Sequence, residues 1–124
     1  MMQIPESAEN YLETIYTLSM QGKPVRAVDI ANALRYSKPS VSIALRNLRE
    51  SGHVAVDGGR IALTKTGHTI AQSMHERHIV MSNWLISLGV PAATAHADAC
   101  KIEHALSDQS FAAIKTFLQK TLDK

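Results

Sequence analysis

Apolar residues recur at helical spacing along most of the chain, and Gly, Pro or polar clusters separate these stretches. The first stretch follows Pro5, with Ser7 as the expected N-cap, and stops before Gly22. A long helix is expected over about 65–88, and Gly89 ends it. Four shorter helices are expected from about Ala27, from Ser37 or Lys38, around Cys100, and from Gln109 to about Leu122. This periodicity predicts a mostly α-helical protein.

Two of the short helices are joined by a tight polar turn, which is typical of a helix-turn-helix. The second ends at Gly52, and its outward face carries Ile43. A β-branched apolar side chain facing water has no core role, but it can contact a thymine methyl group. Alternating apolar residues then flank an Asp57-Gly58-Gly59 turn, which predicts a β-hairpin over 53–63. A hairpin directly after a helix-turn-helix makes a winged helix, with Arg60 beside its tip.

The long helix carries an apolar stripe that is too long for one small domain to cover. We expect this helix to join two domains, residues 1–70 and 71–124, and to supply a dimer contact near Trp84. The stripe on the long helix consists of Ile70, Met74, Met81, Leu85 and Leu88. The expected buried face of the last helix consists of Phe111, Ile114, Phe117 and Leu118.

Composition narrows the protein class only slightly. A chain of 124 residues with 45% hydrophobic residues can bury a moderate core. Its single cysteine cannot form an internal disulfide, and neither a signal-like nor a membrane-spanning run is present. We therefore expect a cytoplasmic protein without a membrane partner.

Basic charge is concentrated in one segment. Seven basic and three acidic residues lie between Val25 and Lys65, a net charge of +4, whereas the charges balance from Ala71 onwards. Phosphate contacts need such a concentration, although an excess of this size favours nucleic acid only modestly.

The helix around Cys100 contains the strongest candidate chemistry. His96, Cys100, Glu103 and His104 fall on one face at spacings of three and four residues. Imidazole, thiolate and carboxylate are ligands of first-row divalent metals. The pattern leaves two interpretations open: a metal site, or an ordinary helix with solvated polar residues and a small buried cysteine.

The order of elements and several local motifs together resemble the diphtheria toxin repressor family of metal-dependent transcription regulators, including its manganese transport regulator branch. Each motif is weak alone, but they follow one another in the family's order over nearly the whole chain. The matching stretches are residues 7–16, 28–31, 39–42, 63–67, 76–78 and 99–107.

The resemblance implies a fold, partners and a cofactor. It implies an N-terminal winged helix-turn-helix with a two-stranded wing, followed by an all-helical dimerisation and metal-binding domain. It also implies a homodimer that binds a palindromic DNA operator when Fe(II) or Mn(II) is sufficient, and that usually represses metal-uptake genes. Such a protein is not an enzyme, and Co(II), Ni(II) or Zn(II) can also bind such a site in vitro.

Carried over residue by residue, the resemblance implies the metal ligands Asn10, Glu13, His78, His96, Cys100, Glu103 and His104, with His96 at an ancillary position. The winged helix is expected to read bases, or to be positioned on them, through Ser37, Pro39, Ser42, Ile43 and Arg46. Its expected contacts to the DNA backbone are Arg26, Lys38, Ser40 and Arg60.

The sequence departs from the family pattern at two ligand positions. Asn10 stands where Met or Asp is usual, and Ser82 stands where iron-responsive members carry Glu. Cys100 instead matches the iron-responsive branch, because the manganese branch tends to have Glu there. A soft thiolate raises affinity for Fe(II) over Mn(II), so we predict Fe(II) as the physiological metal, with Mn(II) second.

Three other functions compete with this one. A winged-helix regulator without a metal switch would bind DNA regardless of chelators. A thiol enzyme would use Cys100 with His96 or His104 as base, although no oxyanion-hole signature accompanies them. A metal buffer or chaperone would bind metal but have no operator.

Overall fold

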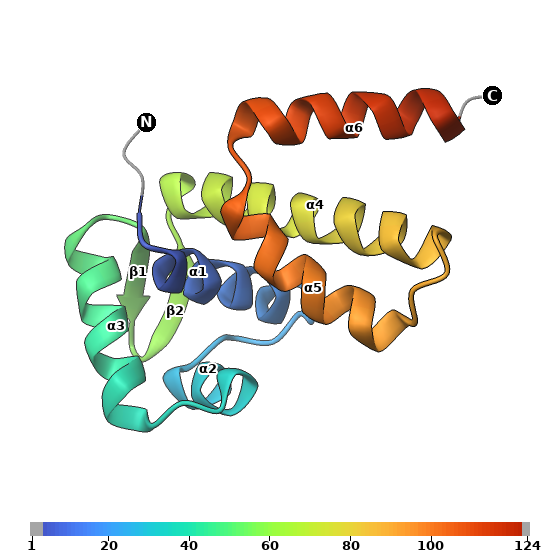
Figure 1. Ribbon diagram of the computed structural model, residues 1–124. Helices are drawn as coiled ribbons and strands as arrows, with labels where there is room; N and C mark the ends of the chain where they lie inside the picture. The colour runs from blue at the N-terminus through green and yellow to red at the C-terminus, as the bar shows by residue number, and fades with distance from the viewer. Residues whose placement is uncertain (1–3, 123–124) are drawn as a thin grey trace. The chain divides into compact units, whose positions relative to one another are not determined.

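The computed structural model describes residues 4–122, which form six helices and two antiparallel strands (Figure 1). The elements are α1 (Glu6–Ser19), α2 (Ala27–Leu34), α3 (Lys38–Glu50), β1 (Val54–Asp57), β2 (Arg60–Leu63), α4 (Lys65–Ser87), α5 (Ala92–Ala105) and α6 (Asp108–Leu122). Contacts divide the chain into two compact units after Ser73, within α4. The mostly helical fold and the hairpin that the sequence predicts are confirmed.

The first unit packs α1, α2 and α3 against the hairpin and the start of α4 (Figure 1). The apolar positions that predicted α1 supply the centre of this core, since Leu12 and Ile15 are fully buried. Tyr11 lies beside them, with its ring centroid 5.9 Å from that of Tyr36. Burial, and secondarily the neighbouring Tyr36 hydroxyl, raise the pKa of Tyr11, so its phenol stays neutral at physiological pH.

The start of α1 differs from the expectation. Ser7 was expected to cap the helix, but Pro5 occupies the N-cap position and Ser7 lies in the first turn. Proline fixes its own φ at −58°, and its carbonyl accepts the first helical hydrogen bond, from the N–H of Glu9 at 3.1 Å. The rigid entry that proline provides therefore replaces a side-chain cap.

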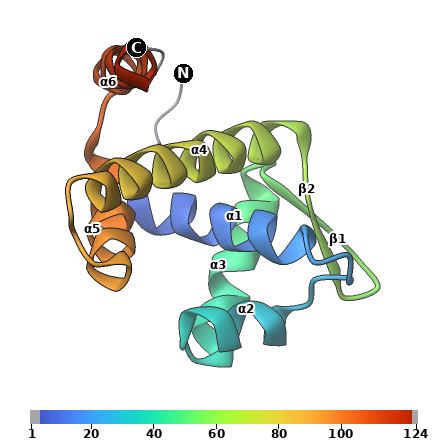
Figure 2. The same cartoon turned by 90° about the vertical axis from the view of Figure 1, so that its right-hand side faces the viewer.

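The helix-turn-helix is formed by α2 and α3, which Figure 2 shows joined by a short turn. Arg35 ends α2 in the left-handed region, with φ of 59°. Ser37 then caps α3, because its Oγ accepts a hydrogen bond from the backbone N–H of Ser40 at 3.3 Å. This turn chemistry fixes where the exposed face of α3 begins.

The wing is a two-stranded hairpin in which Asp57 pairs with Arg60 and Val54 pairs with Leu63. Gly58 and Gly59 form the turn with φ of 56° and 81°, as a two-residue type I′ turn requires. The loop before α2 adds to the sheet, since the N–H of Ile61 donates to the carbonyl of Val25 at 2.8 Å. The wing is thereby attached to the start of α2.

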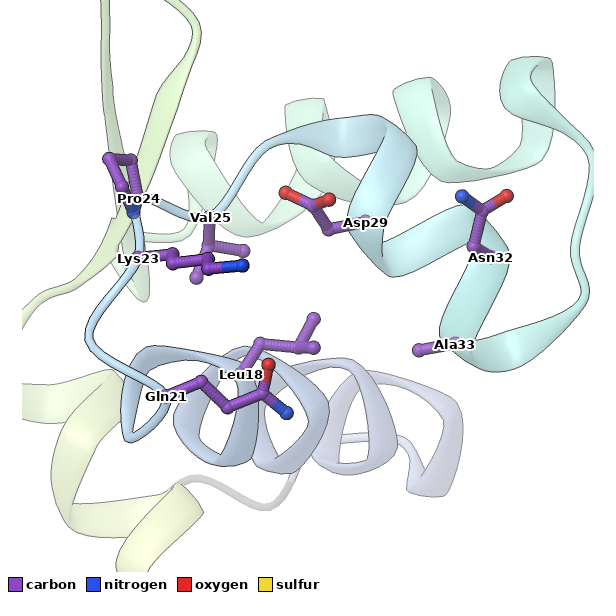
Figure 3. A pocket seen from close by; sticks show the side chains of 8 residues that line it. All are labelled: Leu18, Gln21, Lys23, Pro24, Val25, Asp29, Asn32 and Ala33. Carbon is purple, nitrogen blue, oxygen red and sulfur yellow. The ribbon is translucent and has the colours of Figure 1, made fainter.

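An open pocket of about 380 Å³ lies between the end of α1, the following loop and α2 (Figure 3). Its polar side chains include Lys23, Asp29 and Asn32. The Asp29 carboxylate is engaged locally, because it accepts a hydrogen bond from the N–H of Arg26 at 2.9 Å. Asp29 therefore acts chiefly as part of the cap of α2.

Gly67, near the start of α4, leaves no room for a side chain. A Cβ atom there would lie 2.0 Å from the main-chain oxygen of His53, so the backbone would have to move. We expect Gly67→Ala to lower the free energy of unfolding by about 2 kcal/mol, although alanine is intrinsically the better helix former. Urea unfolding tests this, with the exposed Thr66→Ala as control. An unchanged or higher midpoint for Gly67→Ala would contradict this close packing.

The second unit consists of the remainder of α4 with α5 and α6. A groove of about 500 Å³ lies between α4 and α6, lined by Trp84, Leu88 and Phe117 among others. The predicted burial of Phe117 is wrong for the single chain, where it is 66% exposed. Leu88, at the end of the long stripe that one small domain was not expected to cover, is 64% exposed. Their apolar stripes continue past the residues that one chain can cover, and such an exposed apolar face is typical of an association surface.

Within residues 4–122, none of the helices combines the length and apolar character that crossing a membrane requires.

Candidate metal centre and DNA-binding surface

The candidate ligands of the second unit lie on two helices. His78 is on α4, and the other four follow one another along α5, which starts after Pro91 and is rich in alanine. Burial divides this stripe: His96 and Cys100 are exposed, whereas Glu103 is fully buried and the His104 side chain is 3% exposed. The deepest part of the stripe is therefore its C-terminal turn.

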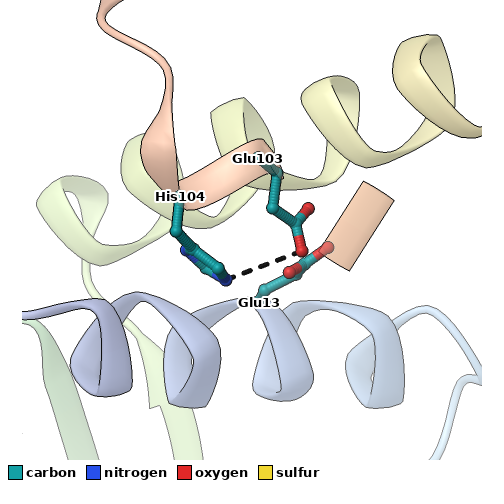
Figure 4. Close-up of side chains that lie close together, drawn as sticks. All are labelled: Glu13, Glu103 and His104. Carbon is teal, nitrogen blue, oxygen red and sulfur yellow. Dashed lines mark ion pairs between the residues drawn. The ribbon is translucent and has the colours of Figure 1, made fainter. Parts of the chain in front are cut away.

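Two imidazoles flank the buried Glu103 carboxylate. The Nδ1 atom of His78 lies 3.7 Å from Oε2. The Nε2 atom of His104 lies 3.6 Å from Oε1, the ion pair that is dashed in Figure 4. The other ring nitrogen of His78 lies 3.2 Å from Nδ1 of His96, and these two rings stack with an interplanar angle of 12°. The four side chains, from α4 and α5, therefore bring their possible metal-ligand atoms next to one another in a row.

This donor set fits a divalent first-row metal. A fully buried carboxylate is costly unless positive charge compensates it, and both flanking imidazoles can donate a lone pair to a cation. The nitrogen–oxygen distances of 3.6 and 3.7 Å are those of ion pairs rather than of direct hydrogen bonds, and they bring all three side chains close together. Oxygen and imidazole donors together suit Mn(II) as well as Fe(II).

The remaining predicted ligands belong to an earlier turn of α5 and to α1. Cys100 is one turn before Glu103 and His104 on α5. Asn10 and Glu13 lie on α1 in the first unit, three residues apart and both half-buried. Ser82, at the position where iron-responsive members carry Glu, is 2% exposed, and its hydroxyl donates to the carbonyl of Ile79 at 3.3 Å.

The predicted DNA contacts are all exposed. They belong to the loop before α2, the N-cap and outward face of α3, and the wing: Arg26, Ser37, Lys38, Pro39, Ser40, Ser42, Ile43, Arg46 and Arg60. Ile43 is 52% exposed, which confirms that it lies outside the core.

A groove of about 310 Å³ separates α3 from the wing. Ser42, Ile43 and Arg46 line one side, and Val56 and Gly59 line the other. Arg49, which was not among the predicted contacts, also lines this groove and is exposed. Its position three residues after Arg46, on the same helical face, was the available signal.

Arg26 is directed at the wing. Its guanidinium donates to the carbonyl of Gly58 at 3.3 Å, and a Cβ atom at Gly59 would lie only 2.8 Å from the same nitrogen. The two glycines at the wing tip therefore serve both the turn and the close approach of this side chain.

Arg77 is a second residue for which the sequence predicted no role. It is 3% exposed on α4, directly before His78, and its side chain reaches the end of α5. Its place in the Glu76-Arg77-His78 motif was the only signal available from the sequence.

Two family models match the chain over nearly its whole length. The model described as the iron dependent repressor, N-terminal DNA binding domain, matches residues 3–62. The model described as the iron dependent repressor, metal binding and dimerisation domain, matches residues 64–122.

Individual proteins are similar over most of the chain. An uncharacterized HTH-type transcriptional regulator of Methanocaldococcus jannaschii is 32% identical over 122 residues, covering 96% of this chain and 98% of that protein. The transcriptional regulator MntR of Escherichia coli O6:H1 is 34% identical over 116 residues, covering 93% and 75%. The structure of the manganese regulator SloR aligns with a TM-score of 0.80 at 30% identity, covering 90% of this chain and 53% of SloR. The chain thus spans about half the length of SloR.

Proposed function

The chain belongs to the iron-dependent repressor family, and on this premise we propose that it is a homodimeric, metal-dependent repressor that binds a palindromic operator in the cytoplasm. One observation carries the proposal: a winged helix with an exposed basic face occurs in the same chain as a buried carboxylate between two imidazoles. The winged helix accounts for DNA binding, and the buried cluster accounts for dependence on a metal.

We propose that Glu103, His104 and His78 form the central part of the metal site. Their donor atoms already lie close together, so little side-chain ordering is needed on binding. When bound, a divalent ion supplies positive charge that the buried carboxylate and the neutral imidazoles share. The sequence resemblance adds Asn10, Glu13 and Cys100 as ligands, and His96 at an ancillary position.

The proposed ligand set connects metal binding to DNA binding. Asn10 and Glu13 belong to the DNA-binding unit, whereas the other ligands belong to the helical unit. Ligands from both units favour one relative orientation when they bind together, so occupancy shifts the population towards that orientation. In a dimer, this orientation would set the spacing of two α3 helices to about one turn of DNA.

On the DNA side, α3 provides most of the proposed contacts. Ser42, Ile43 and Arg46 line the groove beside the wing, and their exposure supports the proposal that they contact base edges. Lys38 and Ser40, in the first turn of α3, and Arg60, in the wing, are suited to phosphate contacts, because they are exposed and either cationic or hydrogen-bonding. Arg26 supports the wing tip while its charge stays close to the same surface.

The metal preference depends on Cys100 in this proposal. We expect Cys100→Glu to shift the ratio of Mn(II) to Zn(II) affinity towards Mn(II) by about tenfold or more, since changes merely next to a metal site alter affinity 10–100-fold. Competition titrations of the two metals against a fluorescent chelator measure this ratio. Cys100→Ser is the control that removes the thiolate without adding a carboxylate, and an unchanged ratio in Cys100→Glu would refute the role given to the thiol.

The function itself is tested by selecting DNA duplexes from a random pool, once with Mn(II) and once with chelator. The proposal expects a palindromic motif to be enriched only in the presence of metal. Enrichment of the same motif with chelator would instead identify a winged-helix regulator without a metal switch. Absence of enrichment in both pools, from a protein that binds Mn(II), would identify a metal buffer.

A further inference from the structure

Arg77 joins three elements of the second unit. From its buried position on α4, one guanidinium nitrogen donates to the carbonyl of Glu103 at 3.2 Å and to the carbonyl of Leu106. The other terminal nitrogen pairs with the Asp108 carboxylate. Its Cζ atom also lies 5.3 Å from the centre of the Phe111 ring. The contacts therefore reach the last turn of α5 and the first turn of α6.

These contacts take the place of a helix cap. The last carbonyls of a helix have no partner within it, and many helices satisfy them with a glycine in the left-handed conformation. Here the residue after α5 is Leu106, which is extended with φ of −83° and ψ of 136°. Arg77 instead satisfies the carbonyls of Glu103 and Leu106, and its positive charge lies at the negative end of the α5 dipole.

Two neighbouring residues of α4 therefore contact Glu103. Arg77 holds its main-chain carbonyl, and the next residue, His78, lies beside its carboxylate. A shift of Arg77 would therefore displace Glu103 at its backbone, and the carboxylate would move with it.

The same arginine locates α6. Asp108 is the first residue of this helix, and Phe111, one turn later, is 7% exposed. Farther along, Phe117 and Leu118 form the groove with Trp84 of α4. The placement of α6 against α4 therefore depends at its N-terminal end on Arg77.

We propose that Arg77 is a positioning residue that couples metal binding at Glu103 to the docking of α6 on α4. The inference rests on the proposed function, because it takes Glu103 as a metal ligand. Coupling is reciprocal: if metal favours the arrangement in which α6 is docked, then a docked α6 raises metal affinity by the same factor.

The first measurement is the Mn(II) affinity of Arg77→Gln, from the electron paramagnetic resonance signal of free Mn(II). We expect affinity to fall about 10–100-fold, the effect typical of residues that orient metal ligands. Arg77→Lys should lose nearly as much, because an ammonium group cannot reproduce the divergent hydrogen bonds of the guanidinium. The matched control is Lys115→Gln, which breaks the 3.0 Å ion pair between α6 and Glu76 of α4 without touching α5. Its affinity should stay within about twofold of wild type.

A second measurement needs no metal. Trp84 is the only tryptophan of the sequence and lines the groove with residues of α6. Its emission should therefore shift to longer wavelength in metal-free Arg77→Gln, as α6 becomes less firmly docked. An unshifted emission would contradict a role in docking α6.

A double-mutant cycle tests the coupling, and its single variant Asp108→Asn covers the case in which Arg77→Gln fails to fold. Asp108→Asn changes a side chain that is 73% exposed, so the protein should fold, and its Mn(II) affinity should fall several-fold. The same substitution should have no further effect in the Arg77→Gln background. Equal effects in both backgrounds, or wild-type affinity in Asp108→Asn alone, would overturn the inference. If the wild-type protein itself binds no Mn(II), the proposed function fails, whereas the Trp84 measurement still tests the docking role.

Discussion

Replacement of Glu103 by glutamine is expected to abolish metal-dependent operator binding. Glutamine keeps the size of this fully buried side chain but removes the negative charge that lies between His78 and His104. Losing a ligand should cost at least as much as the 10–100-fold typical of residues that only orient ligands, so we expect at least about 100-fold weaker metal binding. At about ten times the wild-type dissociation constant, where the wild type is nearly saturated, most of the variant would stay in the metal-free state.

Thermal or urea unfolding with and without Mn(II) measures this effect independently of DNA. At about 100 times its dissociation constant, a ligand adds about 2.7 kcal/mol to the free energy of unfolding. A hundredfold loss of affinity reduces that gain to about 0.4 kcal/mol. Glu76→Gln is the matched control, because it changes an exposed carboxylate of α4 that pairs with Lys115. Full stabilisation of Glu103→Gln by Mn(II) would exclude Glu103 as a ligand.

Replacement of Arg46 by alanine is expected to weaken operator binding strongly. Arg46 is exposed on α3 and lines the groove between α3 and the wing. Loss of one arginine contact typically costs about 1–3 kcal/mol, and a dimer on a palindrome loses it in both half-sites. We therefore expect a loss of roughly 2–6 kcal/mol in dimer binding, with metal affinity unchanged.

Fluorescence anisotropy on operator and on random duplexes, at several salt concentrations, identifies the kind of contact. Equal weakening on both duplexes with a reduced salt slope would indicate a phosphate contact. Weakening mainly on the operator, with altered sequence preference, would indicate base recognition, with guanine as the usual partner of arginine. Lys120→Ala, which removes an exposed charge from α6, should change neither. Operator binding of Arg46→Ala at the wild-type level would remove α3 from the proposed interface.

The helices and strands could be predicted from local sequence signals, because turns and helix caps depend on residues close together in the sequence. The Asp57-Gly58-Gly59 turn specifies its hairpin through the positive φ values that only its glycines adopt easily. Ser37 similarly marks the start of α3, since its side chain caps the helix. The prediction of a side-chain cap failed at Ser7, because the N-cap position of α1 is occupied by Pro5.

Helical spacing was less informative about burial. It placed His96, Cys100, Glu103 and His104 on one stripe, but it could not distinguish the buried end from the exposed one. That difference depends on what packs against each turn. The same limitation explains why Phe117 was expected to be buried and is exposed in the single chain.

Contacts between distant segments could not be predicted at all. Nothing near Arg77 in the sequence indicates the carbonyls of α5 that it contacts, 26 and 29 residues later. The contact of Arg26 with the wing spans 32 residues and depends on the absence of a Cβ atom at Gly59. Both arginines are charged residues with structural partners, and only the folded chain identifies those partners.

The most direct test of the account is anaerobic fluorescence anisotropy of the wild-type protein on its selected operator. The duplex is titrated with protein in the presence of Fe(II), Mn(II) or Zn(II), and chelator is then added. Tight binding that appears with metal and disappears with chelator is the predicted result, with Fe(II) more effective than Mn(II) if the thiolate of Cys100 is a ligand. Equally tight binding before metal and after chelator would contradict the metal switch.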